Sequence, residues 1–404
     1  MTTLSDPPRE SFQLSMLLND TRYRSYTFQF IALIALIAFF GYLGSNLVQN
    51  LRDAGLNISY GFLGEPSNYD INQTLIEYDS RSSHWRASVV GVLNTLLVAF
   101  LACVTATVIG VIAGVLRLSN NWLVRKLMAV YVEAFRNVPV LIWIIIIFTI
   151  MTAVLPAPRD FRGDDPAASM LFDAFAFTNR GVYIPKPVFE TGGVAVVLVF
   201  LLSVVGVFYY RRYATKLLYD TGKLLPMGWP SLAILILPSL VFYVLLGRPI
   251  GLEYPELKGF NFGGGINIRG SLIALWFALA IYTGAFIAEN VRAGIQSVSK
   301  GQTEAAASLG LRPGRIMNLV ILPQALRVII PPLISQYLNI TKNSSLAIAV
   351  GYMDITGTLG GITLNQTGRA IEAVLLLMLF YLVISLSISA LMNVYNNAMK
   401  LKER

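Results

Sequence analysis

Long apolar runs follow one another along the chain, separated by polar segments of very different lengths. A helix that crosses the bilayer core needs about 20 consecutive apolar residues. Runs of this kind cover eight segments, namely residues 28–48, 89–115, 133–155, 192–210, 231–247, 271–289, 328–350 and 372–394. The fifth run is short and contains Pro238, which interrupts helical hydrogen bonding. The pattern predicts an all-α polytopic membrane protein with about eight transmembrane helices.

Composition supports this assignment and narrows the possible chemistry. Only 13% of the 404 residues are charged and the mean hydropathy is +0.63, whereas soluble domains carry about 25% charged residues. With one cysteine, Cys103, and one histidine, His84, the chain can form neither an internal disulfide nor a Cys/His metal cluster. His84 falls in a loop and is predicted to be solvated. The phosphate-binding pattern G-x-x-x-x-G-K-[ST] is absent from the sequence, so we predict no enzyme, no metal and no cofactor in this chain.

The distribution of basic residues predicts the orientation. With both termini placed in the cytoplasm, the inside segments hold 18 Lys and Arg residues and the outside loops hold 11, as the positive-inside rule requires. The outside loops, residues 49–88, 156–191 and 248–270, also hold most of the acids. Their Gly, Pro and Asn content predicts turns in the first, irregular chain in the second and a flexible approach in the third. The net charge of +9 follows from this topology and requires no nucleic-acid partner.

Three polar or small-residue features interrupt the apolar runs. Gly110 and Gly114 lie one turn apart, a spacing that permits close helix contact. Glu133 and Arg136 share a helix face at the start of the third run, where they could form a structural pair. The seventh run contains the consecutive polar residues Lys342, Asn343, Ser344 and Ser345. A lipid-facing lysine costs about 2.5–3.5 kcal/mol or more, so this stretch predicts a broken or pathway-lining helix.

The segment 299–323, "SKGQTEAAASLGLRPGRIMNLVILP", has no role in crossing a bilayer. Ser299 and Gln302 have the spacing of a capping box, which predicts a helix from Lys300 onward. Gly310 supplies a left-handed stop, and Pro313 can begin a second helix that reaches Pro323. Alanines 305–307 leave a smooth surface. Such a small-faced helix suits insertion into a groove of a cytoplasmic partner, and a solvated helical hairpin is the alternative.

A resemblance to a known family favours the first reading. Glu304, Ala305 and Ala306, then Gly310, then Val320, Leu322 and Pro323 resemble the signature loop of permease subunits of ATP-binding-cassette (ABC) importers. "VEAFRNVPVLIW" and "TKNSSLAIAVGYMDI" resemble the polar amino-acid branch of that family, and the length resembles the longer permeases of general L-amino-acid importers. Val138-Pro139 and Asn343-Ser344-Ser345 depart from the branch's usual Thr-Pro and Asp-Thr-Ser.

The resemblance implies a type I importer core in two parts, residues 89–155 and 271–404. An extra first span with its loop (28–88) precedes the core, behind a cytoplasmic segment (1–27), and a two-span insert (156–270) divides it. It further implies a bacterial inner-membrane complex with a second permease, two ATPase subunits that bind ATP and Mg, and a periplasmic amino-acid-binding protein. Glu304, Ala305, Ala306, Gly310, Leu322 and Pro323 would couple to the ATPase.

The substrate pathway would contain Lys342, Asn343, Ser344 and Ser345, with Glu133, Arg136 and Glu289 shaping its cytoplasmic side. An ion-coupled secondary transporter is the alternative function. It would need carboxylates at mid-membrane, whereas Glu133, Glu289 and Glu372 fall near the ends of runs.

Overall fold

The computed structural model describes residues 16–55, 57–163 and 165–399, which form two units, residues 1–62 and 63–404. The first unit holds α1 (Met16–Asn19) and α2 (Thr21–Asp53), and α2 contains the predicted first span. Some of the charged residues used to predict the orientation lie outside the described part. They are the basic residues Arg9, Lys400, Lys402 and Arg404 and the acidic residue Asp164. Much of the N-terminal segment 1–27 also lies outside it.

Eight helices in the described part of the chain are long and apolar enough to span a membrane, which confirms the predicted number. They are Tyr23–Asp53, His84–Leu116, Val140–Phe161, Gly193–Thr221, Gly228–Leu245, Gly270–Gln296, Pro313–Val350 and Ala370–Val394. Each of the eight overlaps one predicted run.

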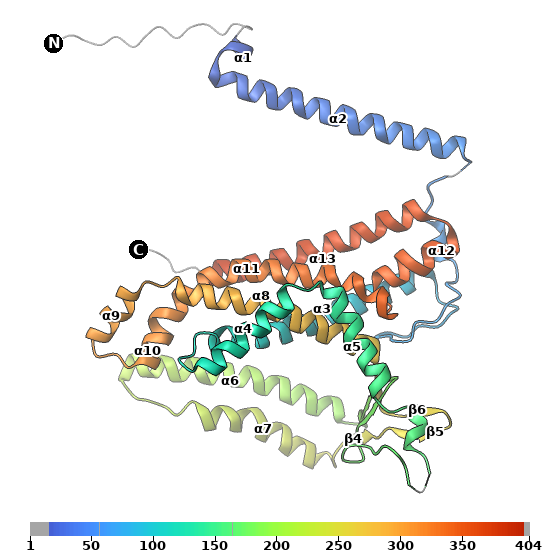
Figure 1. The fold of residues 1–404 in the computed structure, drawn as a ribbon. Helices are drawn as coiled ribbons and strands as arrows, with labels where there is room; N and C mark the ends of the chain where they lie inside the picture. The colour runs from blue at the N-terminus through green and yellow to red at the C-terminus, as the bar shows by residue number, and fades with distance from the viewer. Residues whose placement is uncertain (1–15, 56, 164, 400–404) are drawn as a thin grey trace, which may run out of the picture. The chain divides into compact units, whose positions relative to one another are not determined.

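Within the second unit, α3 (His84–Leu116) and α8 (Gly270–Gln296) pack against each other along their length. Small residues permit the close approach. A Cβ atom added at Gly110 would lie 2.6 Å from Cβ of Ile287, and one at Gly114 would lie 2.7 Å from the carbonyl oxygen of Ala288. The close contact expected from the Gly110–Gly114 spacing is therefore present, and α3–α8 forms the centre of the bundle (Figure 1).

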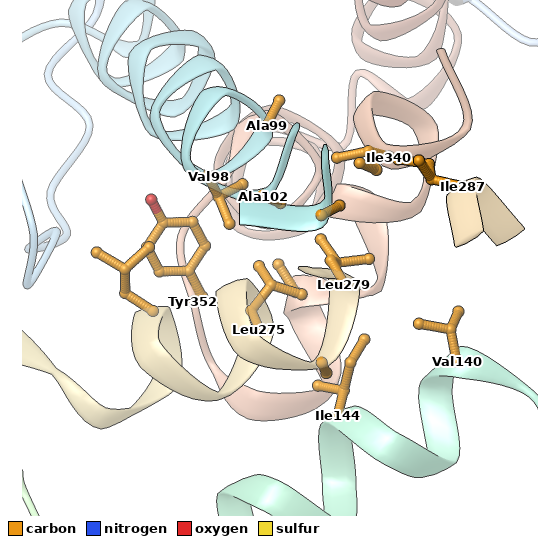
Figure 2. Close-up of a cluster of buried hydrophobic side chains, with 14 of the residues drawn as sticks. Val98, Ala99, Ala102, Val140, Ile144, Leu275, Leu279, Ile287, Ile340 and Tyr352 are labelled. Carbon is orange, nitrogen blue, oxygen red and sulfur yellow. The ribbon is translucent and has the colours of Figure 1, made fainter. Parts of the chain in front are cut away.

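Side chains from three further elements and one loop tyrosine complete the buried core. In Figure 2, Val98 and Ala102 of α3 lie beside Leu275 and Leu279 of α8, with Ile144 approaching from α5 (Val140–Val154). The remaining contributions come from α11 (Leu322–Asn343), the 3₁₀ helix η4 (Ser344–Val350) and the tyrosine that follows it. Because lipid tails are as apolar as these side chains, close van der Waals packing, and not removal from water, holds the formed spans together.

The third predicted span begins later than expected. We predicted one helix over 133–155, but the structure has α4 (Trp122–Arg136), a break, and then α5 from Val140. Pro139 has no amide hydrogen and disfavours helical geometry in the residue before it, so the helix restarts after the proline. Glu133 and Arg136 consequently belong to the end of α4 and not to the span.

The seventh span changes its hydrogen-bonding pattern partway, as the polar stretch predicted. The α-helical part, α11, ends at Asn343, and η4 continues to Val350 before Gly351 adopts a positive φ of 70°. The π-helical segment η5 (Thr356–Thr363), the short α12 (Leu364–Thr367) and α13 (Ala370–Met399) complete the chain.

The insert forms a helix pair and small sheets. Helices α6 (Gly193–Thr221) and α7 (Gly228–Leu245) pack together. The flanking loops were predicted to be irregular and flexible, but they pair with each other. The three-stranded sheet has the order β1 (Ala176–Thr178), β2 (Gly181–Ile184), β7 (Ile266–Arg269), and all its pairs are antiparallel. The two-stranded sheets are β3 (Lys186–Phe189) with β4 (Ile250–Glu253), and β5 (Glu256–Lys258) with β6 (Asn261–Gly263). We call the end of the bundle at β7 and the start of α8 the sheet end.

The loop before α3 also has a defined structure, and the prediction of a solvated histidine was wrong. His84 is buried at the start of α3, where its Nδ1 lies 3.0 Å from the Thr363 hydroxyl. The Tyr69 hydroxyl lies 3.1 Å from the same oxygen. Thr363 is distant in sequence, so the loop composition carried no sign of this contact. The loop is thereby fixed to the last residue of η5.

Candidate functional site

The predicted partner-binding segment forms at the opposite end of the bundle from the sheets. A short helix, α9 (Lys300–Ser308), follows α8 after a bend and stands apart from the packed spans (Figure 1). Its start at Lys300 is as predicted. Ser299 is the N-cap by backbone conformation, with φ of −61° and ψ of 141°, but its side chain makes no capping hydrogen bond. The predicted capping box is therefore absent.

Gln302, the second residue of that expected box, has a different partner. Its side-chain oxygen accepts a hydrogen bond from Nε2 of Gln324, which also donates to the carbonyl oxygen of Val320 at 2.9 Å. The Gln302 side chain is thus directed toward the next helix and not back to the cap. The interaction joins α9 to the beginning of α11 and sets the spacing between the two elements.

Gly310 ends α9 in the predicted left-handed conformation, with φ of 76°. The Gly310 amide donates to the Ala307 carbonyl oxygen at 2.9 Å, and the Leu311 amide donates to Ala306 at 3.3 Å. These two bonds are the Schellman pattern, which satisfies carbonyl groups left free at a helix end. A Cβ at Gly310 would meet nothing within 4 Å. Backbone conformation alone, and not packing, therefore selects glycine here.

The second helix begins at Pro313 as predicted, but it does not end at Pro323. The short α10 (Pro313–Ile316) passes through a π turn, η3 (Met317–Ile321), into α11. Pro323, which has no amide hydrogen, lies in the first turn of α11 directly after the π turn. A single continuous path thus leads from the joint at Gly310 into the seventh span.

The side chains of α9 divide into an exposed and a buried set. Glu304 and Ala305 are exposed, whereas Ala306 is buried against the rest of the chain. Leu309, which follows the helix, is 81% exposed. Leu309 thus adds one apolar side chain to the exposed surface beside α9. Leu322 is also exposed, and Pro323 is half-buried.

The acidic and basic candidates near this end have partners in the chain. Glu289 of α8 forms salt bridges with Arg117, at the end of α3, and with Arg292. The guanidinium of Arg136 lies 5.2 Å from the ring centroid of Phe286, also in α8. Glu133 accepts a hydrogen bond from Asn137 at 3.2 Å. The possible Glu133–Arg136 pair does not form in the described structure. Arg136 and Glu289 instead tie α4 and α3 to α8.

The polar stretch of the seventh span is only partly accessible in this chain. Lys342 is exposed, Asn343 and Ser345 are half-buried, and Ser344 is fully buried. The Ser344 hydroxyl donates to the Thr341 carbonyl oxygen and the Ser345 hydroxyl donates to that of Lys342, both at 2.8 Å. Both hydroxyl hydrogens are therefore already used at the point where α11 becomes η4.

Sequence reasoning did not single out Asp354, which lies just beyond the seventh span. Its side chain is fully buried, and Oδ1 accepts from the Gly357 amide at 2.8 Å while Oδ2 accepts from the Tyr381 hydroxyl at 3.2 Å. Burial, opposed by these hydrogen bonds, raises the pKa of the carboxyl to about 6. A lone acid in "GYMDITG", flanked by glycines, was the available signal. Asp354 fixes the turn between η4 and η5 against α13.

Comparison with known proteins finds relatives that match the chain over nearly its whole length. Residues 210–401 match the family described as "Binding-protein-dependent transport system inner membrane component". The chain is 50% identical to the glutamate/glutamine/aspartate/asparagine transport system permease protein BztB of Rhodobacter capsulatus, over 100% of both chains. It is 44% identical to the putative amino-acid ABC transporter permease protein YhdX of Escherichia coli, over 98% and 99% of the two chains.

A third relative, the general L-amino acid transport system permease protein AapQ of Rhizobium johnstonii, is 43% identical over 95% of this chain and 94% of its own. These matches extend over the first span and the insert as well as the two core parts. With such identity over whole chains, the resemblance seen in the loop and the polar stretch is confirmed, and the ion-coupled alternative is not supported. The chain belongs to the permease subunits of amino-acid ABC transporters and is a multi-pass membrane protein of that family.

Proposed function

We propose that this chain forms half of the membrane pathway of an ATP-driven importer that carries L-amino acids from the periplasm to the cytoplasm. The observation that carries the proposal is α9, held away from the spans and joined to them through Gly310 and α11. The substrates named for the relatives, glutamate, glutamine, aspartate and asparagine for one and general L-amino acids for another, support amino acids as the cargo.

The proposed complex contains a second permease, two cytoplasmic ATPase subunits and a periplasmic binding protein. The chain itself binds no cofactor in this proposal, and ATP and Mg bind to the ATPase subunits. Glu304, Ala305, Ala306 and Gly310 contact the ATPase, and α10 and α11, with Leu322 and Pro323, transmit its movement. In the complex the ATPase covers the exposed Leu309, which lies beside this surface.

The test is amino-acid uptake by the complex purified through this chain and reconstituted into vesicles. We expect uptake that requires ATP, Mg and the binding protein and that continues when proton and sodium gradients are collapsed. Mass spectrometry of the same preparation should find the second permease and the ATPase. Uptake driven by an ion gradient without ATP would contradict the proposal.

The proposed orientation places both termini and α9 in the cytoplasm, and the sheet end in the periplasm. In a Cys103→Ser background, the single substitutions Thr74→Cys and Ser169→Cys should react with a membrane-impermeant thiol reagent in whole cells, because both positions are exposed. Ser308→Cys, also exposed, should react only after the cells are opened. Labelling of position 308 in intact cells would reverse the orientation.

We propose that the exposed Lys342 lines the translocation pathway together with the half-buried Asn343 and Ser345, and that Lys342 offers a charge to the amino-acid carboxylate. The buried Ser344 holds the junction of α11 and η4 behind them. Arg136 and Glu289 shape the cytoplasmic side by fixing α4 and α3 to α8, and Glu133 adds an exposed acid at the end of α4. An alternative role for Lys342 is an ion pair with an acid of the second permease, because a charge within a span needs a partner.

Lys342→Met removes the charge and keeps most of the bulk. If Lys342 lines the pathway, we expect an assembled complex with at least about ten-fold slower uptake, because a hydrogen bond to a charged group contributes about 1.5–3 kcal/mol, or with an altered preference among acidic, neutral and basic amino acids. If Lys342 forms the ion pair, the second permease should be lost on purification. Intact assembly with unchanged uptake would contradict both roles.

A further inference from the structure

A polar cavity of about 240 Å³ lies at the sheet end of the bundle. Its volume is just below the roughly 300–1,000 Å³ of typical small-molecule sites, so it suits a small polar molecule better than a peptide. The core contributes the end of η4 with Gly351 and Tyr352, and the first residues of α8, Gly270 and Ser271. The extra loop contributes Gln73, and the insert contributes further polar residues.

Two arginines give the cavity an uncompensated positive charge. Arg180 lies in the two-residue turn between β1 and β2, and Arg269 lies at the end of β7, opposite Gly181 in the strand register. Acidic residues are absent from the described lining, and neither arginine is in a salt bridge of the described structure. The Arg180 Nη1 donates only to the carbonyl oxygen of Phe260, at 3.2 Å.

The local backbone holds both arginines at the start of α8. The Gly270 amide donates to the Arg180 carbonyl oxygen at 3.4 Å, and the Arg180 amide donates to the Thr178 hydroxyl at 3.2 Å. No side chain caps α8, whose first residues line the cavity. Apart from the Gly270 amide, the amide hydrogens of this first turn have no carbonyl of a preceding helical turn to bond. Such groups attract anions and add to the field of the two guanidinium groups.

The cavity also offers acceptors that lack partners. The side-chain oxygens Oε1 of Gln73 and Oδ1 of Asn179 are buried and without a hydrogen-bond partner in the described structure. Both residues line the cavity. Buried polar atoms normally find a partner, and one left without costs about 1–3 kcal/mol. Asn94 fixes the Gln73 segment, because its Nδ2 donates to the carbonyl oxygens of Gln73 at 2.8 Å and Met353 at 2.9 Å.

We propose that this cavity is a binding site for a free α-amino acid, with acidic amino acids bound most tightly. Arg180, Arg269 and the start of α8 hold the carboxylates, and Gln73 and Asn179 accept from the ammonium group. This assignment rests on the proposed import function, in which the site receives the amino acid at the periplasmic end of the bundle. A site of this kind also gives the insert and the extra loop a role, because the core alone lacks the polar side chains that would bind the amino acid. The insert supplies Asn179, Arg180 and Arg269, and the extra loop supplies Gln73.

The experiment measures binding of radiolabelled L-glutamate, L-glutamine and L-arginine to the purified complex without the binding protein. We expect L-glutamate to bind most tightly and L-arginine most weakly. Arg180→Gln and Arg269→Gln should each weaken L-glutamate binding at least about ten-fold, because a charge-assisted bidentate bond is lost. L-glutamine, with one carboxylate, should be affected less. Arg180→Lys and Arg269→Lys keep the charge and should restore part of the affinity, which separates the effect from misfolding.

Arg159→Gln is the matched control, because Arg159 is an exposed arginine of the same loop outside the cavity lining. It should leave L-glutamate binding unchanged. Carboxylate side chains of the binding protein are the alternative ligands for the two arginines. The affinity of the complex for the binding protein is therefore measured in parallel. Weaker docking of the binding protein with unchanged L-glutamate binding would overturn the proposal, as would absence of L-glutamate binding to the wild-type complex.

Vesicle uptake by the wild-type complex separates this inference from the function on which it rests. ATP-driven amino-acid uptake with L-glutamate binding unaffected by both Arg→Gln substitutions would overturn the cavity assignment alone. Absence of ATP-driven uptake would overturn the proposed function itself.

Discussion

Gly310→Val is expected to abolish most ATP-driven uptake while the protein remains in the membrane. The left-handed conformation of Gly310 costs an ordinary residue about 1–2 kcal/mol and is especially unfavourable for a β-branched side chain. Valine would therefore shift the chain to another backbone conformation and break the two Schellman bonds to Ala306 and Ala307. The direction of α9 relative to α11 would change, and we expect at least about ten-fold slower uptake because about 1.4 kcal/mol corresponds to a ten-fold change.

The matched control is Gly310→Asn at the same position. Asparagine tolerates the left-handed conformation much better than valine, and a side chain here meets nothing within 4 Å. It should therefore retain most of the uptake and of the ATPase bound on purification. If the valine variant transported at the native rate with the ATPase bound, the coupling role of this joint would be wrong. If both variants failed equally, a clash between the new side chain and the ATPase would be responsible, and not a change of backbone conformation.

Gly110→Leu should prevent stable packing of the bundle. Even the first carbon of the new side chain would lie 2.6 Å from Ile287 and 2.9 Å from the carbonyl oxygen of Gly284. The latter contact is with backbone, which cannot rotate away. Overpacking a filled interior typically costs about 1–3 kcal/mol, and a whole leucine side chain between α3 and α8 should reach the upper part of that range or exceed it.

The measurement is the thermal unfolding of the detergent-purified chain, followed by size-exclusion chromatography of heated samples. Val108→Leu is the control, because Val108 is an exposed residue of the same helix. Gly110→Leu should give little monodisperse protein or a clearly lower unfolding temperature, and the control should match the wild type. Equal stability of the two variants would show that α3 and α8 do not pack as closely as described.

The number of spans and the helix–glycine–helix design of 299–323 could be read from the sequence because their causes are local. Apolar run length, a left-handed glycine and an N-terminal proline act within a few residues. The break at Pro139 was equally local, because the proline and the polar residues Arg136 and Asn137 before it mark the start of α5, although we predicted one helix across it.

Long-range contacts explain most of what the sequence did not reveal. His84 is buried because Thr363, 279 residues later, completes its site. Strand β2 forms because β7 returns beside it after two intervening spans. Gln302 leaves its expected cap because Gln324 is within reach in the folded chain. For the candidate site, the positions of the loop residues were predictable, whereas the burial of Ser344 and the partners of Glu289 depended on packing between helices.

The amide pair Gln302–Gln324 has a consequence for how the chain behaves under different ionic conditions. Both side chains are uncharged, so dissolved ions screen their hydrogen bond far less than a pair of opposite charges, and neither group gains or loses a proton at any pH the cell experiences. The angle at which α9 leaves α11 should therefore stay the same from dilute buffer to molar salt. A salt-dependent step in the transport cycle would then arise at contacts between subunits, and not from a change of shape in this segment.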